Sequence, residues 1–397
     1  MNKIHYIKEA IVAAAIILGF TGLVSLLPLK FEFLKAIRQD VYGFDIYDLY
    51  YTEKNIQSTL RDNNIVVIQI ADDRNSIADQ INIIEKYHPA VIGIDAYFDR
   101  SRDTADIKFL KAIENKDNLV FGVRLDTLKS NPGDLIFKRN FFDTGINSYK
   151  SGYINFVGNE FSVIRNYPPF LKLDGKEQLA FTSRIIQLYS PGRFDTLKNR
   201  KRPEEIINYS GNTEIYTCIT KEELLEYDST GQLSELFKNK IILVGYFIKY
   251  PPFVLNDLHF SPLNAQFAGK SFPDIYGVVI HANILSMILS GDYAKMASNS
   301  TAYLFAYLFT FLFLLYVIYL HSKKNHPAHA KILLIQFLLV LMVLYLFLQV
   351  YNLFLWKVPL LPLLISLVLC IELLGIYKII ALWLHKKTGY KTVFAHK

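Results

Sequence analysis

Four long apolar stretches and one large polar block divide the chain. The stretches are Ala10–Leu29, Thr301–Leu320, Ile332–Tyr351 and Val358–Leu384. About 20 consecutive apolar residues form a helix that crosses the hydrocarbon core of a bilayer, so each stretch predicts a transmembrane helix. The block between the first two stretches, residues 30–300, is too polar and too long to be a loop. We expect it to fold as a separate domain.

The first half of this block alternates apolar runs with helical patterns. Ile65–Ile70, Val91–Phe98 and Leu119–Leu125 are short, nearly continuous apolar runs. Between them, Ser76–Tyr87 and Thr104–Asn115 repeat apolar residues with the period of a helix. Continuous apolar strands separated by helices are typical of a parallel sheet that is covered on both faces. The pattern therefore predicts an α/β domain with a mostly parallel sheet.

The second half of the block mixes shorter elements. We expect a hairpin of Gly152–Val157 with Ser162–Asn166, a helix at Gln178–Tyr189, and strands at Glu205–Tyr209 and Lys240–Gly245. A long loop, Tyr246–Tyr276, then leads to an apolar helix, Gly277–Ser290. The last of these helices brings the chain back to the membrane.

The formal charge of +7 is distributed unevenly along the chain. Residues 30–300 contain 32 basic and 34 acidic side chains, a net of −2, so the flanking segments together carry +9. Most of this excess lies in residues 1–9, in the segment between the second and third stretches, and in the tail 385–397. The positive-inside rule places these three segments in the cytoplasm and residues 30–300 outside it. The basic composition therefore reports membrane topology rather than binding of nucleic acid.

The first stretch is either an uncleaved signal anchor or a cleaved signal peptide. Its apolar run is longer than the roughly 7–15 residues of a signal-peptide core, and no A-x-A-like cleavage site follows it, so we favour the anchor. The cysteines are Cys218 in the block and Cys370 in the fourth stretch, and this topology keeps them apart. The outer domain is therefore expected to be stable through its own core, without a disulfide.

The order of motifs within the block resembles the CHASE2 domain, an extracytoplasmic sensory module of bacterial signalling proteins. The matching pieces are Asp45–Tyr50, Ile65–Asp73, Ala90–Phe98, Gly152–Asn155 with Ile164 and Arg165, Ile207–Gly211, Asn239–Gly245, Asp257–Pro262 and Tyr276–Asn283. One span before the domain and three after it are also similar to that family's layout. The resemblance implies a sensor in the bacterial inner membrane, with its domain in the periplasm and both termini in the cytoplasm.

Two features depart from that family. Arg74–Asp79 stands where the family often has a Trp- and Pro-rich stretch, so no role of that stretch is carried over. Relatives usually continue into a histidine kinase, a nucleotide cyclase or a Ser/Thr kinase, whereas only the tail 385–397 follows the last span here. We therefore expect a separate protein, cytoplasmic or in the membrane, to supply the output.

Acidic residues follow the first two predicted strands. Asp72 and Asp73 come after the first, and Asp95 and Asp99 lie within and just after the second. Ligands of open parallel sheets bind outside the carboxyl ends of the strands, so we expect Asp72, Asp73 and Asp99 to converge there. Polar residues of the second half could join them, namely Asp257, His281 and Asn283. Carboxylates at such a place suit a hard cation, a ligand amine or a sugar hydroxyl.

Each of these residues also has a structural interpretation. Asp72 and Asp73 could cap the helix that follows them, and Asp95 could be a satisfied polar group inside its strand. His281 could be a ligand contact or a proton switch, or it could be hydrogen-bonded to the adjacent loop. Arg165 could bind an anionic ligand through its bidentate fork, or it could pair with a surface carboxylate. The sequence leaves these alternatives open.

Motifs of the common enzyme classes are absent from the sequence. The chain has no G-x-x-x-x-G-K-[ST] loop, no G-x-G-x-x-G after the first strand, no H-E-x-x-H and no G-x-S-x-G. We therefore predict that the protein is not an enzyme and that it carries no cofactor or metal ion.

One acidic residue lies inside a predicted span. Glu372 is near the middle of the fourth stretch, where a carboxylate costs a few kcal/mol and usually faces a protein partner or a polar cavity. Gln336 and Gln349 of the third stretch could be its partners within the chain, and a second subunit is another candidate. Alternatively, a protonated Glu372 could bond to a neighbouring backbone carbonyl.

Three functions compete at this point. The first is a sensor subunit whose outer domain binds an unidentified small ligand and signals through its helices to a separate partner, with a homo-oligomer left open. The second is a non-sensory docking or assembly subunit of a cell-envelope complex. The third, an extracytoplasmic enzyme acting at the acidic strand ends, is the least favoured because no nucleophile or metal motif supports it.

Overall fold

The computed structural model describes residues 3–26, 45–57, 61–101, 104–128, 131–143, 150–156, 162–173, 175–250, 257–264, 273–321 and 329–395. Its contacts divide the chain into two units. The α/β unit is Asp40–Ala294, and the helical unit consists of Met1–Gln39 and Lys295–Lys397.

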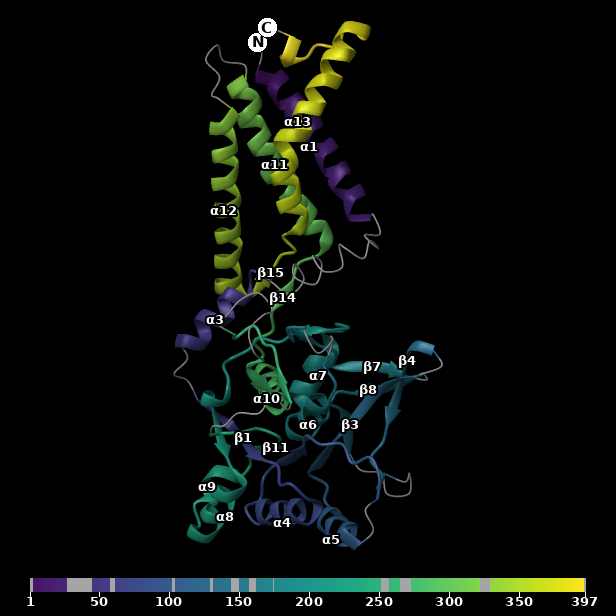
Figure 1. Ribbon diagram of the computed structural model, residues 1–397, viewed down its shortest axis with the longest axis vertical. Coiled ribbons are helices and arrows are strands. Elements are labelled where there is room, and N and C mark those ends of the chain that lie inside the picture. Colours follow the sequence, from purple (N-terminus) through teal and green to yellow (C-terminus); the bar gives the residue numbers. More distant parts are fainter. Residues whose placement is uncertain are drawn as a thin grey trace. The chain divides into compact units, whose positions relative to one another are not determined.

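A seven-stranded sheet forms the centre of the α/β unit (Figure 1). Its strands are β1 (Asp62–Gln69), β2 (Val91–Ile94), β3 (Leu119–Leu128), β4 (Asn131–Lys138), β5 (Ser151–Tyr153), β10 (Tyr216–Ile219) and β11 (Ile241–Gly245). The strand order is β10-β1-β11-β2-β3-β4, and β5 also pairs with β3. Every pairing is parallel except that of β3 with β4. The prediction of an α/β fold with a mostly parallel sheet is therefore confirmed.

Helices cover both faces of this sheet, because its central strands are apolar on both sides. One face carries α4 (Arg74–Glu85), α5 (Thr104–Ile113), α8 (Lys221–Thr230) and α9 (Leu233–Phe237), and the other carries α6 (Phe181–Tyr189), α7 (Pro191–Asn199) and α10 (Gly277–Ser290) (Figure 1). Helix α6 approaches β2 closely at Gly93, where a Cβ would lie 2.6 Å from Ile185 and 2.9 Å from Phe181. The core is therefore built from two apolar layers, one on each face of the sheet.

Smaller elements complete the α/β unit. They are helix α3 (Asp48–Gln57), the 3-10 helix η1 (Thr213–Ile215), and three antiparallel ladders, β6 with β9 (Asn166–Tyr167 and Glu205–Ile206), β7 with β8 (Phe170–Leu173 and Lys176–Leu179) and β12 with β13 (Leu258–His259 and Ile275–Tyr276). The three ladders are separate from the main sheet, and α3 bonds to Arg165 and to the carbonyls of Pro262 and Asn264.

The predicted hairpin of residues 152–166 is wrong. Its first arm contains β5, which extends the main sheet in parallel with β3. Asn166, in the second arm, pairs with Ile206 of β9. The third residue of the predicted arm, Ile154, donates its N–H to the carbonyl of Val123 and so continues the parallel ladder. The predicted turn at Gly158-Asn159 lies outside the described residues.

Other elements of the second half differ from the prediction in length or were missed. The predicted helix Gln178–Tyr189 begins at Phe181, and the predicted strand Glu205–Tyr209 is a strand only at Glu205–Ile206. The predicted loop Tyr246–Tyr276 contains β12 and β13. Strand β10 was not predicted, because it lies at the sheet edge and its two middle residues are only partly buried.

The helical unit contains four helices that are long and apolar enough to cross a membrane, counted over the described residues. They are α1 (Lys3–Leu26), α11 (Asn299–His321), α12 (His329–Phe354) and α13 (Leu361–Thr388). Helices α1, α11 and α13 share an apolar core, and α12 packs against α13 (Figure 1). The four predicted apolar helices are confirmed, although residues 27–29 of the first stretch lie outside the described part.

Short elements join the ends of these helices. Strand β14 (Lys295–Met296), which precedes α11, pairs in parallel with β15 (Trp356–Lys357), which lies between α12 and α13. The N–H of Lys295 donates to the carbonyl of Leu355 at 2.7 Å, and the N–H of Ala297 donates to that of Lys357 at 2.8 Å. The start of α11 is therefore bonded to the connection between α12 and α13. The 3-10 helix η2 (Val393–Ala395) follows α13.

Candidate functional site

The chain leaves the central strands towards opposite faces of the sheet. After β1 and β2 it continues into α4 and α5 on one face, and after β11 it continues through β12 and β13 into α10 on the other. Strand β11 lies between β1 and β2. Ligands of open α/β sheets commonly bind at the carboxyl ends of strands between which the chain diverges in this way. This edge of the sheet is therefore where a binding site is expected.

Four titratable side chains gather at this edge, and we call Asp95, Asp257, His259 and His281 the acid–histidine cluster. Nε2 of His281 lies 3.8 Å from Oδ1 of Asp95, and Nε2 of His259 lies 3.5 Å from Oδ1 of Asp257. The ring of Phe156 contacts both imidazoles, with its centroid 4.8 Å from that of His281 and 5.3 Å from that of His259. The cluster is thus two acid–histidine pairs joined by one aromatic ring.

Backbone bonds hold the inner pair in place. The N–H of Asp95 donates to the carbonyl of Val244 at 2.8 Å, which continues the ladder between β2 and β11 beyond the strand end. At the end of β11, a Cβ on Gly245 would lie 2.7 Å from the side chain of Val278 and 3.3 Å from Cβ of Asp95. Glycine is therefore needed there for the first turn of α10 to approach the strand. That approach brings His281, in the next turn, to Asp95.

The outer pair lies at the beginning of α10. Asp257 has a φ of +56°, and its carbonyl accepts the N–H of Gly277, the first residue of α10, at 3.2 Å. A Cβ on Gly277 would lie 3.1 Å from Oδ2 of Asp257, so the carboxylate rests on the glycine. Within the described residues, the N-cap residue Tyr276 makes no side-chain bond to the first turn of α10. The positive end of the helix dipole therefore favours a negative charge at Asp257.

The side chains of the cluster range from buried to partly exposed. The side chains of Asp95 and His281 are 8% and 5% exposed, whereas those of Asp257 and His259 are 44% and 32% exposed. Burial raises the pKa of Asp95 well above its ordinary value, and the charge of Asp257 adds to that shift. Burial lowers the pKa of His281 to about 3, with a further contribution from His259. Burial therefore disfavours the charged form of both groups of the inner pair.

Unused polar atoms lie beside the inner pair. Nδ1 of His281 and the hydroxyl of Tyr167 are buried, and neither has a hydrogen-bond partner among the described residues. Both side chains line a small cavity, together with Phe156 and Thr182. A buried polar atom without a partner costs about 1–3 kcal/mol, so the cavity favours a small polar guest that bonds to these atoms.

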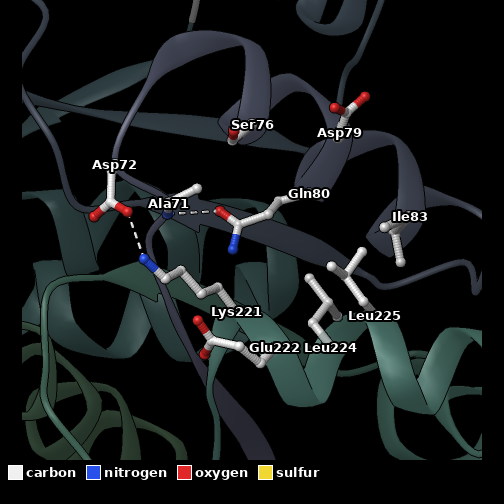
Figure 2. A pocket seen from close by; sticks show the side chains of 10 residues that line it. All are labelled: Ala71, Asp72, Ser76, Asp79, Gln80, Ile83, Lys221, Glu222, Leu224 and Leu225. Carbon is white, nitrogen blue, oxygen red and sulfur yellow. Dashed lines mark hydrogen bonds and ion pairs between the residues drawn. The ribbon is translucent and has the colours of Figure 1, made fainter.

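A second candidate site is a groove of about 330 Å³ between α4 and α8 (Figure 2). Ten residues line it, namely Ala71, Asp72, Ser76, Asp79, Gln80, Ile83, Lys221, Glu222, Leu224 and Leu225. The carboxylate of Asp72 and the ammonium of Lys221 pair across the groove, and Gln80 accepts the N–H of Ala71 at 2.9 Å (Figure 2). Leu225 is 60% exposed. The groove therefore combines charged groups at its mouth with an exposed apolar wall.

The structure divides the predicted site into separate places. Asp95, Asp257 and His281 come together, whereas Asp72 lies in the groove and pairs with Lys221. Asp99 is exposed. Among the described residues no hydrogen bond or ion pair joins Asp72 or Asp73 to Asp99 or to the acid–histidine cluster, so the expected convergence of Asp72, Asp73 and Asp99 stays a prediction.

Three of the predicted residues, Asp73, Arg165 and Asn283, have structural roles. Asp73 caps α4 by accepting the N–H groups of Asn75 and Ser76, so the capping interpretation holds for it. Its pKa is lowered, first by the hydroxyl of Ser76. Arg165 forms a bidentate ion pair with Asp48 of α3, at 2.9 and 2.5 Å.

The side chain of Asn283 is fully buried, and its hydrogen bonds are with backbone groups. Its Oδ1 accepts the N–H of Ser210 at 2.8 Å, and its Nδ2 donates to the carbonyls of Gly211 and Val279, each at 2.9 Å. These bonds fasten α10 to the segment that precedes β10.

Sequence reasoning missed His259, Phe156 and Lys221. His259 is two residues from Asp257, so its side chain could have been placed beside that acid if β12 had been predicted. Phe156 and Lys221 gave no signal, because only the folded chain brings them to the other site residues.

The polar residues of the spans are arranged differently from the prediction. Nε2 of Gln336 donates to the carbonyls of Leu367 and Val368 of α13, at 2.6 and 2.8 Å, and not to Glu372. Glu372 itself is exposed, and the side chain of Gln349 is partly buried. A buried acid of α1, Glu9, accepts a hydrogen bond from Tyr377 of α13. The polar bonds inside the bundle therefore use residues other than Glu372.

Among the described residues, no group of three or more His, Cys, Asp or Glu side chains could hold a metal ion. In the comparison with protein families, the model of the CHASE2 domain matches residues 12–320. No curated protein and no solved structure matches the chain. The matched range contains the acid–histidine cluster and the groove, most of α1 and nearly all of α11.

Proposed function

Because the chain belongs to the CHASE2 family of extracytoplasmic sensory domains, we propose that it is a bacterial inner-membrane receptor whose acid–histidine cluster binds a small ligand. In this proposal the α/β unit lies in the periplasm, and the helical unit passes the bound state to a separate partner protein. A ligand can shift such a receptor only if it binds one of two conformations more tightly than the other.

The observation that carries this proposal is the course of α10. The helix begins at Gly277, against Asp257, and its fifth residue is His281. Its 14 residues span about 21 Å, since a helix rises 1.5 Å per residue. Only eight residues separate its last residue, Ser290, from the first residue of α11. One rigid element thus connects the cluster by a short link to an apolar helix.

The link itself favours transmission to more than one helix. Strand β14 lies within it and is bonded to β15, which connects α12 to α13. A shift of the C-terminal end of α10 would therefore pull on α11 through the chain and on α12 and α13 through the ladder. Small helix shifts of this kind are a common carrier of signals between sites.

The chemistry of the cluster restricts the ligand class. Burial disfavours charge on both groups of the inner pair, and the cavity beside it has room only for a small group. The outer pair offers a carboxylate beside an imidazole, both of them accessible. We therefore propose a polar ligand whose hydroxyl or amine bonds to Asp257 and His259, such as a polyol, a sugar or a primary amine. Its arrival would displace Asp257 from Gly277.

The test uses the purified full-length chain in nanodiscs and a panel of sugars, polyols and primary amines. A ligand at a concentration a hundred times its Kd raises the free energy of unfolding by about 2.7 kcal/mol. This corresponds to a rise of about 5–10 °C in the melting temperature of a domain of this size. Asp257→Asn and His259→Gln should abolish the rise, and both are exposed enough to leave the fold intact. Asp99→Asn, an exposed acid outside the cluster, is the matched control.

Transmission is read separately from binding. A fluorophore attached at Ser300→Cys, at the beginning of α11, should change its emission when the ligand binds, and Asp257→Asn should remove that change. Stabilisation that survives both cluster variants would place the ligand elsewhere. Stabilisation without any change at position 300 would contradict the role of α10.

The groove between α4 and α8 supports a second candidate, a docking subunit of an envelope complex. Its exposed leucine beside charged groups matches the arrangement of a protein interface, which has an apolar centre and a polar rim. Affinity purification of the full chain from native membranes discriminates between the two functions. A stoichiometric partner lost with Leu225→Asp but retained with Asp257→Asn would favour docking, and the reverse pattern would favour sensing.

A further inference from the structure

Glu372 breaks an otherwise apolar surface on α13. The residues of its exposed face on the turns before and after it are apolar, with Val368 55% and Ile379 69% exposed. Glu372 forms no hydrogen bond or ion pair within the part of the chain that the structure describes. It is the eleventh residue after Leu361, so it lies about 16 Å along the helix and close to the middle of the span. A carboxylate at that depth in hydrocarbon costs about 2.5–3.5 kcal/mol.

The exposed face follows a heptad spacing. Positions 361, 365, 368, 372, 375, 379 and 382 alternate steps of four and three residues, and none of them is buried. The opposite face of α13 is buried against the other helices of the unit, through residues that include Leu367, Cys370, Leu374 and Ala381. Membrane helices pair mostly with the crossing geometry of coiled coils, which uses a seam of this spacing.

Gly375 gives this seam a point of close approach. It lies one turn after Glu372 on the same face, and a Cβ at this position would meet no atom within 4 Å. Small residues at such positions let two membrane helices bring their backbones together. The seam therefore has both a polar group and a place where a second helix can come near it.

We propose that α13 forms a homodimer through this seam, with Glu372 of one chain hydrogen-bonded to Glu372 of a second copy. Two copies inserted in the same orientation present α13 in parallel, so each seam residue meets its own counterpart at the same depth. A carboxyl group that keeps its proton has both a donor and an acceptor, so two of them satisfy each other without a charge. A seam with one central carboxyl is therefore complementary to itself.

The positions of the basic residues on the described helices favour a carboxyl group of a second copy, rather than a basic side chain, as the partner of Glu372. The basic residues of α1, α12 and α13 lie near the helix ends, except for Lys378, whose ammonium lies 6.0 Å from the ring of Phe394. A second copy therefore places its own Glu372 carboxyl at the same depth in the membrane, and no basic side chain of the described helices lies at that depth. This dimer is independent of the proposed ligand site, because it depends only on the helical unit.

The test is disulfide crosslinking of the full chain in native membranes. In a background with Cys218→Ser and Cys370→Ala, Val368→Cys places a thiol on the seam one turn from Glu372. Oxidation should give a species of twice the 45.8 kDa chain. Leu346→Cys on α12 is the matched control, because it is also exposed and lies at a similar distance from the outer end of its helix. It should give at least tenfold less dimer.

A second pair of variants tests the carboxyl itself. Adding Glu372→Leu should lower the association, measured over a series of protein-to-lipid ratios, by about tenfold, since a hydrogen bond between membrane helices contributes about 1–2 kcal/mol. Glu372→Gln should retain the association, because an amide also donates and accepts. No dimer at Val368→Cys, equal dimer at Leu346→Cys, or no effect of Glu372→Leu would overturn the proposal. A crosslinked species containing a different protein would overturn it in favour of a heterologous partner.

Discussion

Replacing His281 with leucine should change how the stability of the α/β unit depends on pH. In the folded chain the imidazole is 5% exposed, and burial lowers its pKa to about 3 from an ordinary value of 6.5. The unfolded chain therefore binds a proton at His281 below pH 6.5, while the folded chain stays neutral there down to about pH 3. Stability rises with pH wherever the unfolded state binds more protons. The contribution of His281 is fully present above pH 6.5 and is lost as the pH falls towards 3.

The magnitude follows from these two pKa values. One pH unit is equivalent to about 1.36 kcal/mol, so at pH 5.0 the wild type has lost about 2 kcal/mol of unfolding free energy through this residue, and at pH 7.5 almost none. Leucine has a similar volume and no titrating group. The difference between the unfolding free energies of the variant and the wild type should therefore change by about 2 kcal/mol, in favour of the variant, between pH 7.5 and 5.0.

Other titratable groups face the same place. Asp95, beside the imidazole, has a raised pKa and acts in the opposite direction, because its folded form binds a proton more readily than its unfolded form. Asp257 and His259 lie on the open side of the cluster. These groups are present in both proteins, so the difference curve isolates His281.

The assay is pulse proteolysis of the full-length chain in urea at pH 5.0, 6.0 and 7.5, read as loss of the α/β unit. His88→Asn is the control, because His88 is exposed and its φ of +52° is one that asparagine tolerates. Parallel stability curves for the wild type and His281→Leu would refute the reasoning. They would mean that water or a proton reaches the imidazole in the folded state.

Three further substitutions have defined outcomes in the same assay at pH 7.5. Gly152→Ala should lower the free energy of unfolding by about 3 kcal/mol, because its Cβ would lie 2.7 Å from backbone atoms that cannot rotate away. Gly192→Ala, with no atom within 4 Å of its Cβ, should be neutral or stabilising. Equal effects of the two substitutions would contradict this packing. Asp73→Ala should cost about 1 kcal/mol through loss of the α4 cap, and no cost would mean that water replaces it. Arg165→Lys keeps the charge but loses the bidentate bond to Asp48, and should cost about 1 kcal/mol and raise hydrogen exchange in α3; unchanged exchange would show that the fork does not hold that helix.

The apolar pattern predicted the parts of the fold that depend on local sequence. Ile65–Ile70 and Val91–Phe98 predicted two central strands, because a strand buried on both faces must be almost continuously apolar. The four apolar helices were predicted for a similar reason, since a span is defined by its own length and composition. The cap at Asp73 is also local, because an N-cap bonds only to the next few residues.

Pairing between distant segments was not predictable in this way. The segment around Gly152 looked like one arm of a hairpin, yet it joins β3 in parallel because α6 packs on its glycine, with the backbone of Ala180 against it. Strand β10 has too few buried residues to be recognised, because an edge strand is covered on one side only.

The sequence by itself identified Asp95, Asp257 and His281 as candidate site residues, and the tertiary structure decided which candidates meet and added His259 to them. Asp72, Asp95 and Asp257 were all candidates as acids near strand ends. Only the folded chain pairs Asp72 with Lys221 in the groove, and only the return of α10 brings His281 to Asp95. The same holds in the helical unit, where composition identified Glu372, but the packing of α13 decided that it faces outwards. A side chain's chemistry is local, whereas its partners depend on contacts between segments far apart in the chain.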